Sequence, residues 1–234
     1  MRRPIAGLAV AAILSLAACS AARPAALPTG AAPAARSVPE ATAPAPDPSG
    51  PPAASGAPAP GPAPVGGGPY LFPIGGTFNY GRSHHDYPAT DIISPCGSVV
   101  RAVTDGTVLE VSRIDRYDAK HPLGQYKGGL SVSILGTDGV RYYGSHLSRI
   151  QSGIKAGVRV KAGQEVGKVG HTGNANGVCH LHYGISPPCA RTGDWKVRRG
   201  VVWPATFLTS WRAGGSKSPV ATVAKWKKAH NCKA

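Results

Sequence analysis

The sequence predicts a mostly β fold, built as an antiparallel sheet or sandwich-like domain with short helices near the C-terminus. Two observations support this prediction. Strand and turn signals recur at short intervals from residue 98 onward, and helical periodicity is nearly absent before residue 204. Asp-Gly pairs at 105–106 and 138–139 each separate two apolar, alternating segments, a pattern typical of β-hairpins, whose strands pair antiparallel.

Each Asp-Gly pair predicts one hairpin. The paired segments are 98–103 with 107–112 and 130–135 with 140–146. Residues 161–170 alternate in the same way around Ala162-Gly163. Between the two hairpins, residues 114–129 form a long polar loop, of the kind that often borders a functional site.

The segment Cys179–Ser186, CHLHYGIS, is predicted to be a strand because of its aromatic and β-branched residues and the two prolines that follow. Residues two apart in a strand share a face, so His180 and His182 would point one way while Leu181 faces the core. Imidazole is the commonest zinc ligand and titrates near neutral pH, so this strand could supply a ligand, a catalytic base or both. The alternative is two half-exposed polar residues that alternate with core residues.

Two helices are predicted late in the chain. Pro204 would start a helix that runs through Trp211. Ser218, an N-cap residue followed by a proline in the first turn, would start a second helix that runs through His230. The buried stripe of this second helix is expected to consist of Val220, Val223 and Ala224.

The first 19 residues are predicted to be an export signal, with two arginines, an apolar run too short to cross a bilayer comfortably, and Cys19. Residues 16–19 resemble the bacterial lipobox, which implies cleavage before Cys19 and a lipid anchor on it. The alternative is an ordinary cleaved signal that contains a cysteine.

Residues 20–68 hold 13 of the 23 prolines and no aromatic residue, so they are predicted to be a disordered linker.

Residues 69–234 are predicted to form one domain with a basic extension at 191–234. The chain carries a formal net charge of +15 at pH 7, and lysine and arginine are frequent after Ala190. This charge implies an anionic partner. An exported protein meets anionic lipid and cell wall polymers first, so we expect such polymers and no nucleic acid as partners. A solvated basic surface explains the charge equally well.

Four cysteines follow the predicted signal. In an oxidising compartment an even number favours disulfides over thiolate metal sites, and four cysteines allow three pairings. We favour Cys96 with Cys179 and Cys189 with Cys232. The second bridge would fasten the C-terminal tail to the domain.

The segment SHHDYPATDIISP, residues 83–95, contains the residues that would complete a zinc site. A hydrolytic zinc site uses about three protein ligands and leaves one position for water. His85 and Asp91, on either side of a stiff Tyr-Pro bend, could join a histidine of the CHLHYGIS strand. Because Asp91 begins an apolar stretch, its carboxylate needs a partner. That partner would be a zinc ion or, alternatively, a surface salt bridge.

These segments, together with YYGSHLS at 142–148 and VGHTGNANGVCHLH at 169–182, resemble the lysostaphin and LytM type of zinc peptidases over about residues 72–190. The resemblance implies one zinc ion and a pair of catalytic histidines. The implied zinc ligands are His85, Asp91 and His182, and the implied catalytic pair is His146 and His180. In that family three residues separate the first histidine from the aspartate. Here five do, so His84 remains open as the first ligand.

Other residues are assigned by the same resemblance. Gly170, Thr172 and Gly173 match the turn that precedes the His-x-His strand. The histidines that match no motif are expected on the surface. They are His121, His171 and His230.

The resemblance implies a zinc-dependent endopeptidase that hydrolyses peptide bonds in peptidoglycan stem peptides or cross-links. It would act as a lipid-anchored monomer in the cell envelope, outside the cytoplasm. One catalytic histidine would take a proton from water and the other would stabilise the oxyanion. The competing hypothesis is a catalytically inactive relative that binds the cell wall or activates another hydrolase. All five site positions are present, which favours an enzyme.

Overall fold

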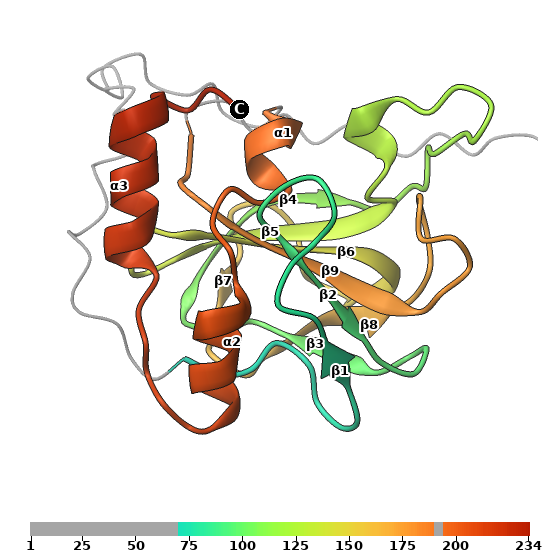
Figure 1. Cartoon of the computed structure of the whole chain (residues 1–234). Coiled ribbons are helices and arrows are strands. Elements are labelled where there is room, and N and C mark those ends of the chain that lie inside the picture. The colour runs from blue at the N-terminus through green and yellow to red at the C-terminus, as the bar shows by residue number, and fades with distance from the viewer. Residues whose placement is uncertain (1–69, 190–193) are drawn as a thin grey trace, which may run out of the picture. The chain divides into compact units, whose positions relative to one another are not determined.

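A sheet of nine strands forms the body of the protein (Figure 1). The computed structural model describes residues 70–189 and 194–234, so the predicted signal peptide (1–19) and linker (20–68) lie outside the described residues. All strand pairs are antiparallel, and only short helices accompany the sheet, which confirms the mostly β class. Within the described ranges, no helix combines the length and the apolar character needed to cross a membrane.

The elements follow one another with short connections. The strands are β1 (Asn79–Tyr80), β2 (Thr90–Ile93), β3 (Val99–Arg101), β4 (Gly106–Ser112), β5 (Leu130–Gly136), β6 (Arg141–Ile150), β7 (Arg159–Val160), β8 (Glu165–Val169) and β9 (His180–Ser186). The helices are a 3-10 turn η1 (Gly124–Tyr126), α1 (Trp195–Arg198), α2 (Ala205–Arg212) and α3 (Val220–His230).

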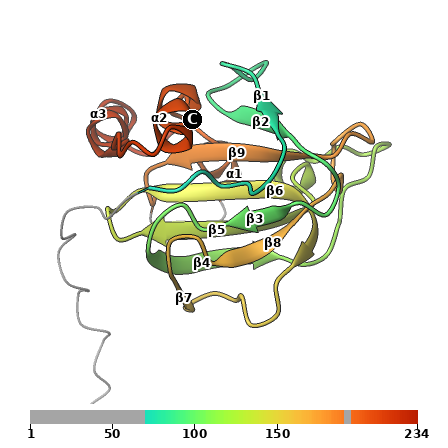
Figure 2. The same ribbon diagram turned by 90° about the horizontal axis from the view of Figure 1, so that it is seen from below.

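The predicted CHLHYGIS strand is β9, and it lies inside the sheet between β2 and β6. The sheet continues from β6 to β5, β4 and β7, and the far half of β6 also pairs with β8 beyond a register shift. Figure 2 shows α2 and α3 outside the sheet on the β9 side. Leu181 is buried in the core, as predicted, and so is Tyr183. His180 and His182 on the opposite face are buried too.

The first predicted hairpin is wrong. β3 pairs with β8, and β4 pairs with β5 and β7, so the segments on either side of Asp105-Gly106 do not pair with each other. Asp105 instead accepts hydrogen bonds from the Ala162 amide and the Lys161 ammonium, at 2.8 Å each. The turn thus leads from β3, which pairs with β8, to β4, which pairs with β5 and β7. The strands on either side of Ala162-Gly163 are β7 and β8, but β7 pairs with β4, and β8 pairs with β3 and β6.

The second predicted hairpin is confirmed, since β5 pairs with β6 around Asp138-Gly139. Gly139 has a φ of 78°, a left-handed conformation that glycine adopts without steric cost. The Asp138 side chain accepts the Val140 amide at 3.0 Å and the Tyr70 hydroxyl at 2.8 Å. The turn is therefore also a buried polar junction with the first described residue.

Both predicted C-terminal helices are present, and each begins directly after a proline, α2 after Pro204 and α3 after Pro219. The predicted buried stripe of α3 is only partly correct. Val223 is buried, whereas Val220 is 40% exposed and Ala224 is exposed. The helix packs through Val223 and Trp226, so most of its surface faces solvent.

Both favoured disulfides are confirmed, and Cys189–Cys232 fastens the end of α3 to the domain.

The short helix α1 was not predicted, and an ion pair fastens it to the sheet. Arg141 of β6 is 1% exposed and donates two hydrogen bonds to the carboxylate of Asp194, the residue before α1. Its Nε atom donates to the Ser186 hydroxyl of β9 at 3.0 Å. A bidentate guanidinium–carboxylate pair has fixed geometry, so it holds the start of α1 against the strands that carry the histidines.

We expect Asp194→Ala to lower the free energy of unfolding by about 3 kcal/mol, because it leaves the buried Arg141 charge uncompensated. Lys161→Gln, which removes an exposed ion pair with Asp105, is the control and should cost less than about 1 kcal/mol. Urea denaturation of both variants checks this expectation. Equal losses in the two variants would contradict the anchoring role of Asp194.

Candidate metal centre and catalytic cleft

Strand pairing brings the site residues together from distant parts of the sequence. β2 and β9 are paired so that Asp91 lies directly opposite His182. On the other side of β9, Ser145 of β6 is opposite His182, which places the neighbouring His146 close to it. The pairing registers of β9 therefore determine the positions of these residues.

Three side chains converge as a candidate metal centre, namely His84, Asp91 and His182. One ligand atom from each lies within 4.8 Å of the others. The His182 Nδ1 atom is 3.0 Å from Asp91 Oδ1, and the His84 Nε2 atom is 3.7 Å from Asp91 Oδ2. Two imidazoles and one carboxylate form a donor set that suits zinc in hydrolytic enzymes.

The environment of these three residues fits a bound cation. His182 donates from Nε2 to the Arg199 carbonyl at 2.9 Å, which aims its Nδ1 atom at Asp91. The Nδ1 atom of His84 is buried and, among the described residues, has no hydrogen-bond partner. A buried polar atom without a partner is costly, and a cation coordinated by this Nδ1 atom would remove that cost.

The charge states of the cluster also suit metal binding. Burial alone would raise the pKa of Asp91, but its contact with His182 and the other nearby histidines lower it to about 2. Burial and the neighbouring His182 lower the pKa of His84. At neutral pH the cluster therefore offers an ionised carboxylate and a neutral His84 imidazole, the forms that bind a cation.

The cluster contains the alternative first ligand, His84, and not His85, which the sequence favoured. His85 is exposed, and the three-residue cluster contains His84 instead. The His84 ring packs against Tyr87 and against the edge of His182, at centroid distances of 4.4 and 5.0 Å. The chain before the Tyr87-Pro88 bend thus turns His84 inward. His85 still lines the same cavity.

The two histidines predicted to be catalytic lie side by side next to the cluster. The rings of His146 and His180 are 4.6 Å apart, and both are buried. His146 donates from Nδ1 to the Thr172 carbonyl at 2.7 Å, and His180 donates from Nδ1 to the Val178 carbonyl at 2.8 Å. Both rings therefore keep the Nε2 lone pair available, and His180 Nε2 lies 3.9 Å from Asp91.

The turn at 170–173 holds His146 in an unusual backbone conformation. His146 has a φ of 63°, which is uncommon for a residue other than glycine and is concentrated at functional sites. The Thr172 hydroxyl donates to the Leu147 carbonyl at 2.7 Å and accepts the Leu130 amide at 3.0 Å. A side chain at Gly173 would meet the Lys127 carbonyl at 2.3 Å. These contacts fix the turn whose Thr172 carbonyl orients the His146 ring.

Burial lowers the pKa of His146 to about 4, with smaller contributions from the charges of His182 and His180. The imidazole is therefore neutral at pH 7 and can accept a proton.

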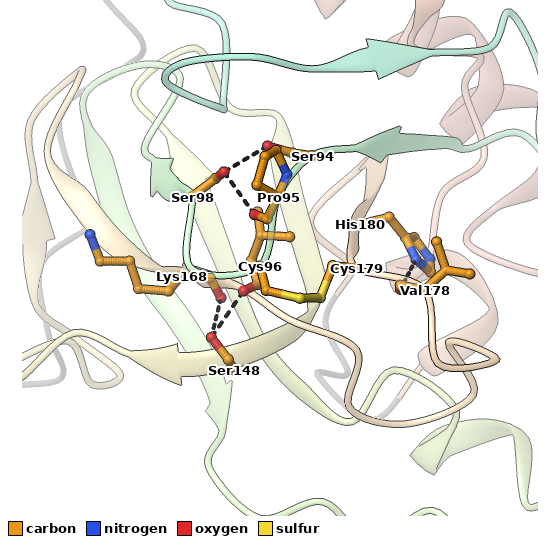
Figure 3. Close-up of a disulfide and its surroundings, with 10 residues drawn as sticks. Ser94, Pro95, Cys96, Ser98, Ser148, Lys168, Val178, Cys179 and His180 are labelled. Carbon is orange, nitrogen blue, oxygen red and sulfur yellow. Dashed lines mark hydrogen bonds between the residues drawn. A yellow bond between two sulfur atoms is a disulfide. The ribbon is translucent and has the colours of Figure 1, made fainter.

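The Cys96–Cys179 disulfide lies directly beside His180 (Figure 3). It joins the loop after β2 to the residue before β9, across 83 residues of sequence. On the β2 side, the Ser94 and Ser98 hydroxyls bond to each other at 2.8 Å, and Ser98 also donates to the Pro95 carbonyl. The bridge thereby holds the Val178–Cys179 backbone whose carbonyl orients the His180 ring.

A cavity of about 240 Å³ opens onto the metal cluster and the histidine pair. One wall comes from the end of the predicted loop at 114–129 and another from Trp195, Arg198 and Arg199 in and after α1. These three residues were not predicted, because a helix of four residues leaves no periodic pattern in the sequence. The predicted surface histidines, His121, His171 and His230, are exposed and do not line the cavity.

Comparison with known proteins supports a relationship to bacterial endopeptidases. Residues 85–193 match the model of peptidase family M23. The chain is 34% identical over 119 residues to glycyl-glycine endopeptidase ALE-1 of Staphylococcus capitis, which covers 50% of this chain and 27% of that protein. It is 31% identical over 137 residues to the L-Ala–D-Glu endopeptidase of Bacillus subtilis, which covers 56% of this chain and 36% of that protein.

Among solved structures, the catalytic domain of lysostaphin from Staphylococcus simulans aligns with a TM-score of 0.44 and 25% identity. The alignment covers 57% of this chain and 93% of that one. The chain thus spans about a quarter to a third of the length of the two curated relatives. The matched segment contains His85, Asp91, His146, His180 and His182. Residues 85–193 of this chain are therefore similar to peptidase family M23.

Proposed function

We propose that this protein is a zinc-dependent endopeptidase that hydrolyses peptide bonds in peptidoglycan. The observation that carries the proposal is the convergence of a His–Asp–His cluster and a histidine pair on one cavity. The endopeptidase names of the relatives and the family match support the same reaction class. In this proposal His84, Asp91 and His182 hold the metal, and His146 and His180 are the catalytic residues.

The proposed mechanism assigns a separate task to each group. A zinc ion, when bound, would act as a Lewis acid and lower the pKa of water to about 7. His146 and His180 each donate Nδ1–H to a fixed backbone carbonyl, so each can accept a proton at Nε2 and return it to a leaving amine. Once protonated, either imidazole can donate from Nε2 to an oxyanion. The fixed carbonyls keep both rings in one orientation throughout.

We further propose that the protein works in the cell envelope, anchored by a lipid on Cys19 and acting as a monomer. The two disulfides support an oxidising compartment outside the cytoplasm. The net charge of +15 supports attraction to anionic cell wall polymers.

Globomycin, which blocks cleavage of the signal peptide of bacterial lipoproteins, tests the lipid anchor. Treated cells should accumulate the precursor that is uncleaved before Cys19. If treatment leaves the mass of the mature protein unchanged, the lipid anchor is contradicted.

Zinc content separates the two candidate first ligands. We expect purified protein to hold one zinc per chain, His84→Ala to lose most of it, and His85→Ala to retain it, because only His84 reaches Asp91 and His182. Elemental analysis after dialysis checks this. Retention of zinc by His84→Ala together with its loss from His85→Ala would return the ligand role to His85.

Activity tests the histidine pair. His180→Ala should keep its zinc and lose about 100-fold or more in the rate of peptide release from purified sacculi, because it removes an acid–base group but no ligand. The exposed His121→Ala is the matched control and should keep full activity. Stoichiometric zinc with no cleavage, in wild type and His180→Ala alike, would leave an inactive wall-binding protein as the function.

The disulfide next to His180 should matter more for turnover than the distant one. Cys96→Ser/Cys179→Ser should lower kcat about tenfold or more, because the Val178 carbonyl that orients the ring loses its support. The control Cys189→Ser/Cys232→Ser removes the other bridge and should change kcat much less. Steady-state kinetics with zinc-loaded protein check this, and equal kcat values for the two double variants would refute it.

A further inference from the structure

The wall of the cavity formed by α1 and Arg199 lies beyond residue 193, where the family match ends. This segment is held rigidly. A side chain at Gly184 of β9 would meet the Arg199 carbonyl at 2.3 Å, and one at Gly200 would meet the Pro88 carbonyl at 2.3 Å. The Arg199 backbone is thus packed against both the strand and the bend that carry metal-binding residues, so its side chain starts from a fixed point.

The Arg199 guanidinium lies between aromatic rings at the cavity. It sits 3.6 Å from the centroid of the Tyr87 ring and 5.0 Å from that of Trp195. The Trp195 ring is itself packed against Gly124 of η1, where a side chain would meet it at 2.3 Å. Stacking on rings orients a guanidinium without using its in-plane donors, so the N–H groups remain available for a planar anion.

Arg199 differs from the two neighbouring buried arginines in having no acidic partner. Arg198 donates to Glu110 at 3.1 Å and Arg141 pairs with Asp194, whereas no carboxylate in the described part of the chain lies within 4.0 Å of Arg199. Its Nε atom is buried and lacks a hydrogen-bond partner among those residues. A half-buried, uncompensated cation with an unpaired donor is costly, and a bound anion would remove that cost.

Arg199 lies close to the groups that carry out the proposed reaction. Its carbonyl accepts the hydrogen bond from His182, and its side chain lines the same cavity as His146 and His180. An anion paired with it would lie in the cavity that His146 and His180 also line. The acid nearest the centre, Asp91, is already bonded to His182 and does not neutralise Arg199.

We propose that Arg199 binds a free carboxylate of the peptide substrate, and that the protein therefore prefers acid-bearing peptides over uncharged glycine chains. This inference rests on the proposed function and narrows its substrate class. Arg199 is a binding residue here, because its guanidinium contacts the substrate and not the reacting atoms. Tyr87 and Trp195 are positioning residues that hold the guanidinium by stacking.

The test compares intact sacculi with sacculi whose free carboxylates have been converted to carboxamides by carbodiimide coupling with ammonia. Initial rates of peptide release give kcat/KM for each substrate, and zinc content and Tm are measured for every variant. The variants are Arg199→Gln, Arg199→Lys and, as a control, Arg212→Gln. Arg212 stacks on Phe78 at 5.1 Å in a separate part of the surface, so it matches the chemistry of Arg199 without lining the cavity.

We expect wild type to favour the untreated sacculi by about tenfold or more, as a charge-assisted hydrogen bond to a carboxylate would give. Arg199→Gln should bring this ratio close to one, Arg199→Lys should give an intermediate ratio, and Arg212→Gln should keep the wild-type ratio. Should Arg199→Gln fold poorly, the ratio for Arg199→Lys decides, because it retains the charge but loses the fork of donors.

Two outcomes would overturn the inference while leaving the proposed function intact. Wild type could cleave both preparations equally, or Arg199→Gln or Arg199→Lys could keep the full wild-type preference. A different result, no release from either preparation by zinc-loaded wild type, would overturn the proposed function itself and the inference with it.

Discussion

The antiparallel pairing of β9 with β2 on one side and β6 on the other is the constraint on which the site depends. It sets Asp91 opposite His182, which lies 91 residues later in the sequence, and it brings His146 of β6 next to His180. A slip of one residue in either ladder would turn alternate side chains to the other face. Because Leu181 and Tyr183 fill the core on the opposite face, such a slip would also bury histidines in apolar surroundings.

Backbone carbonyls orient each of the three histidines on or next to β9. His182, His146 and His180 donate to the carbonyls of Arg199, Thr172 and Val178 respectively. Each carbonyl belongs to a segment fixed by another feature, namely close packing at Gly184, the Thr172 hydroxyl bonds and the Cys96–Cys179 bridge. The ring tautomers therefore follow from the fold and do not require further titratable side chains.

Much of this arrangement could be predicted from the sequence, because period-two alternation and turn residues are local signals. They predicted the face shared by His180 and His182, the β5–β6 hairpin and the helices after Pro204 and Ser218. The choice between His84 and His85 was not predictable, since it depends on how the chain turns before the Tyr87-Pro88 bend. The predicted hairpin at Asp105-Gly106 is wrong because an Asp-Gly turn between two strands looks the same in the sequence whether those strands pair with each other or with different strands. The helix α1 is too short to leave a periodic pattern.

The anchoring of α1 has a consequence for how such a domain can diversify. Its attachment through Asp194 and Arg141 is independent of the β2–β9 ladder that aligns Asp91 with His182. Residues exposed to the cavity on this short segment can therefore be exchanged while the reactive groups stay in place. The cavity wall and the histidine–aspartate cluster would then vary on separate parts of the molecule, and grafting α1 with its ion pair offers a route to reshaping that wall alone.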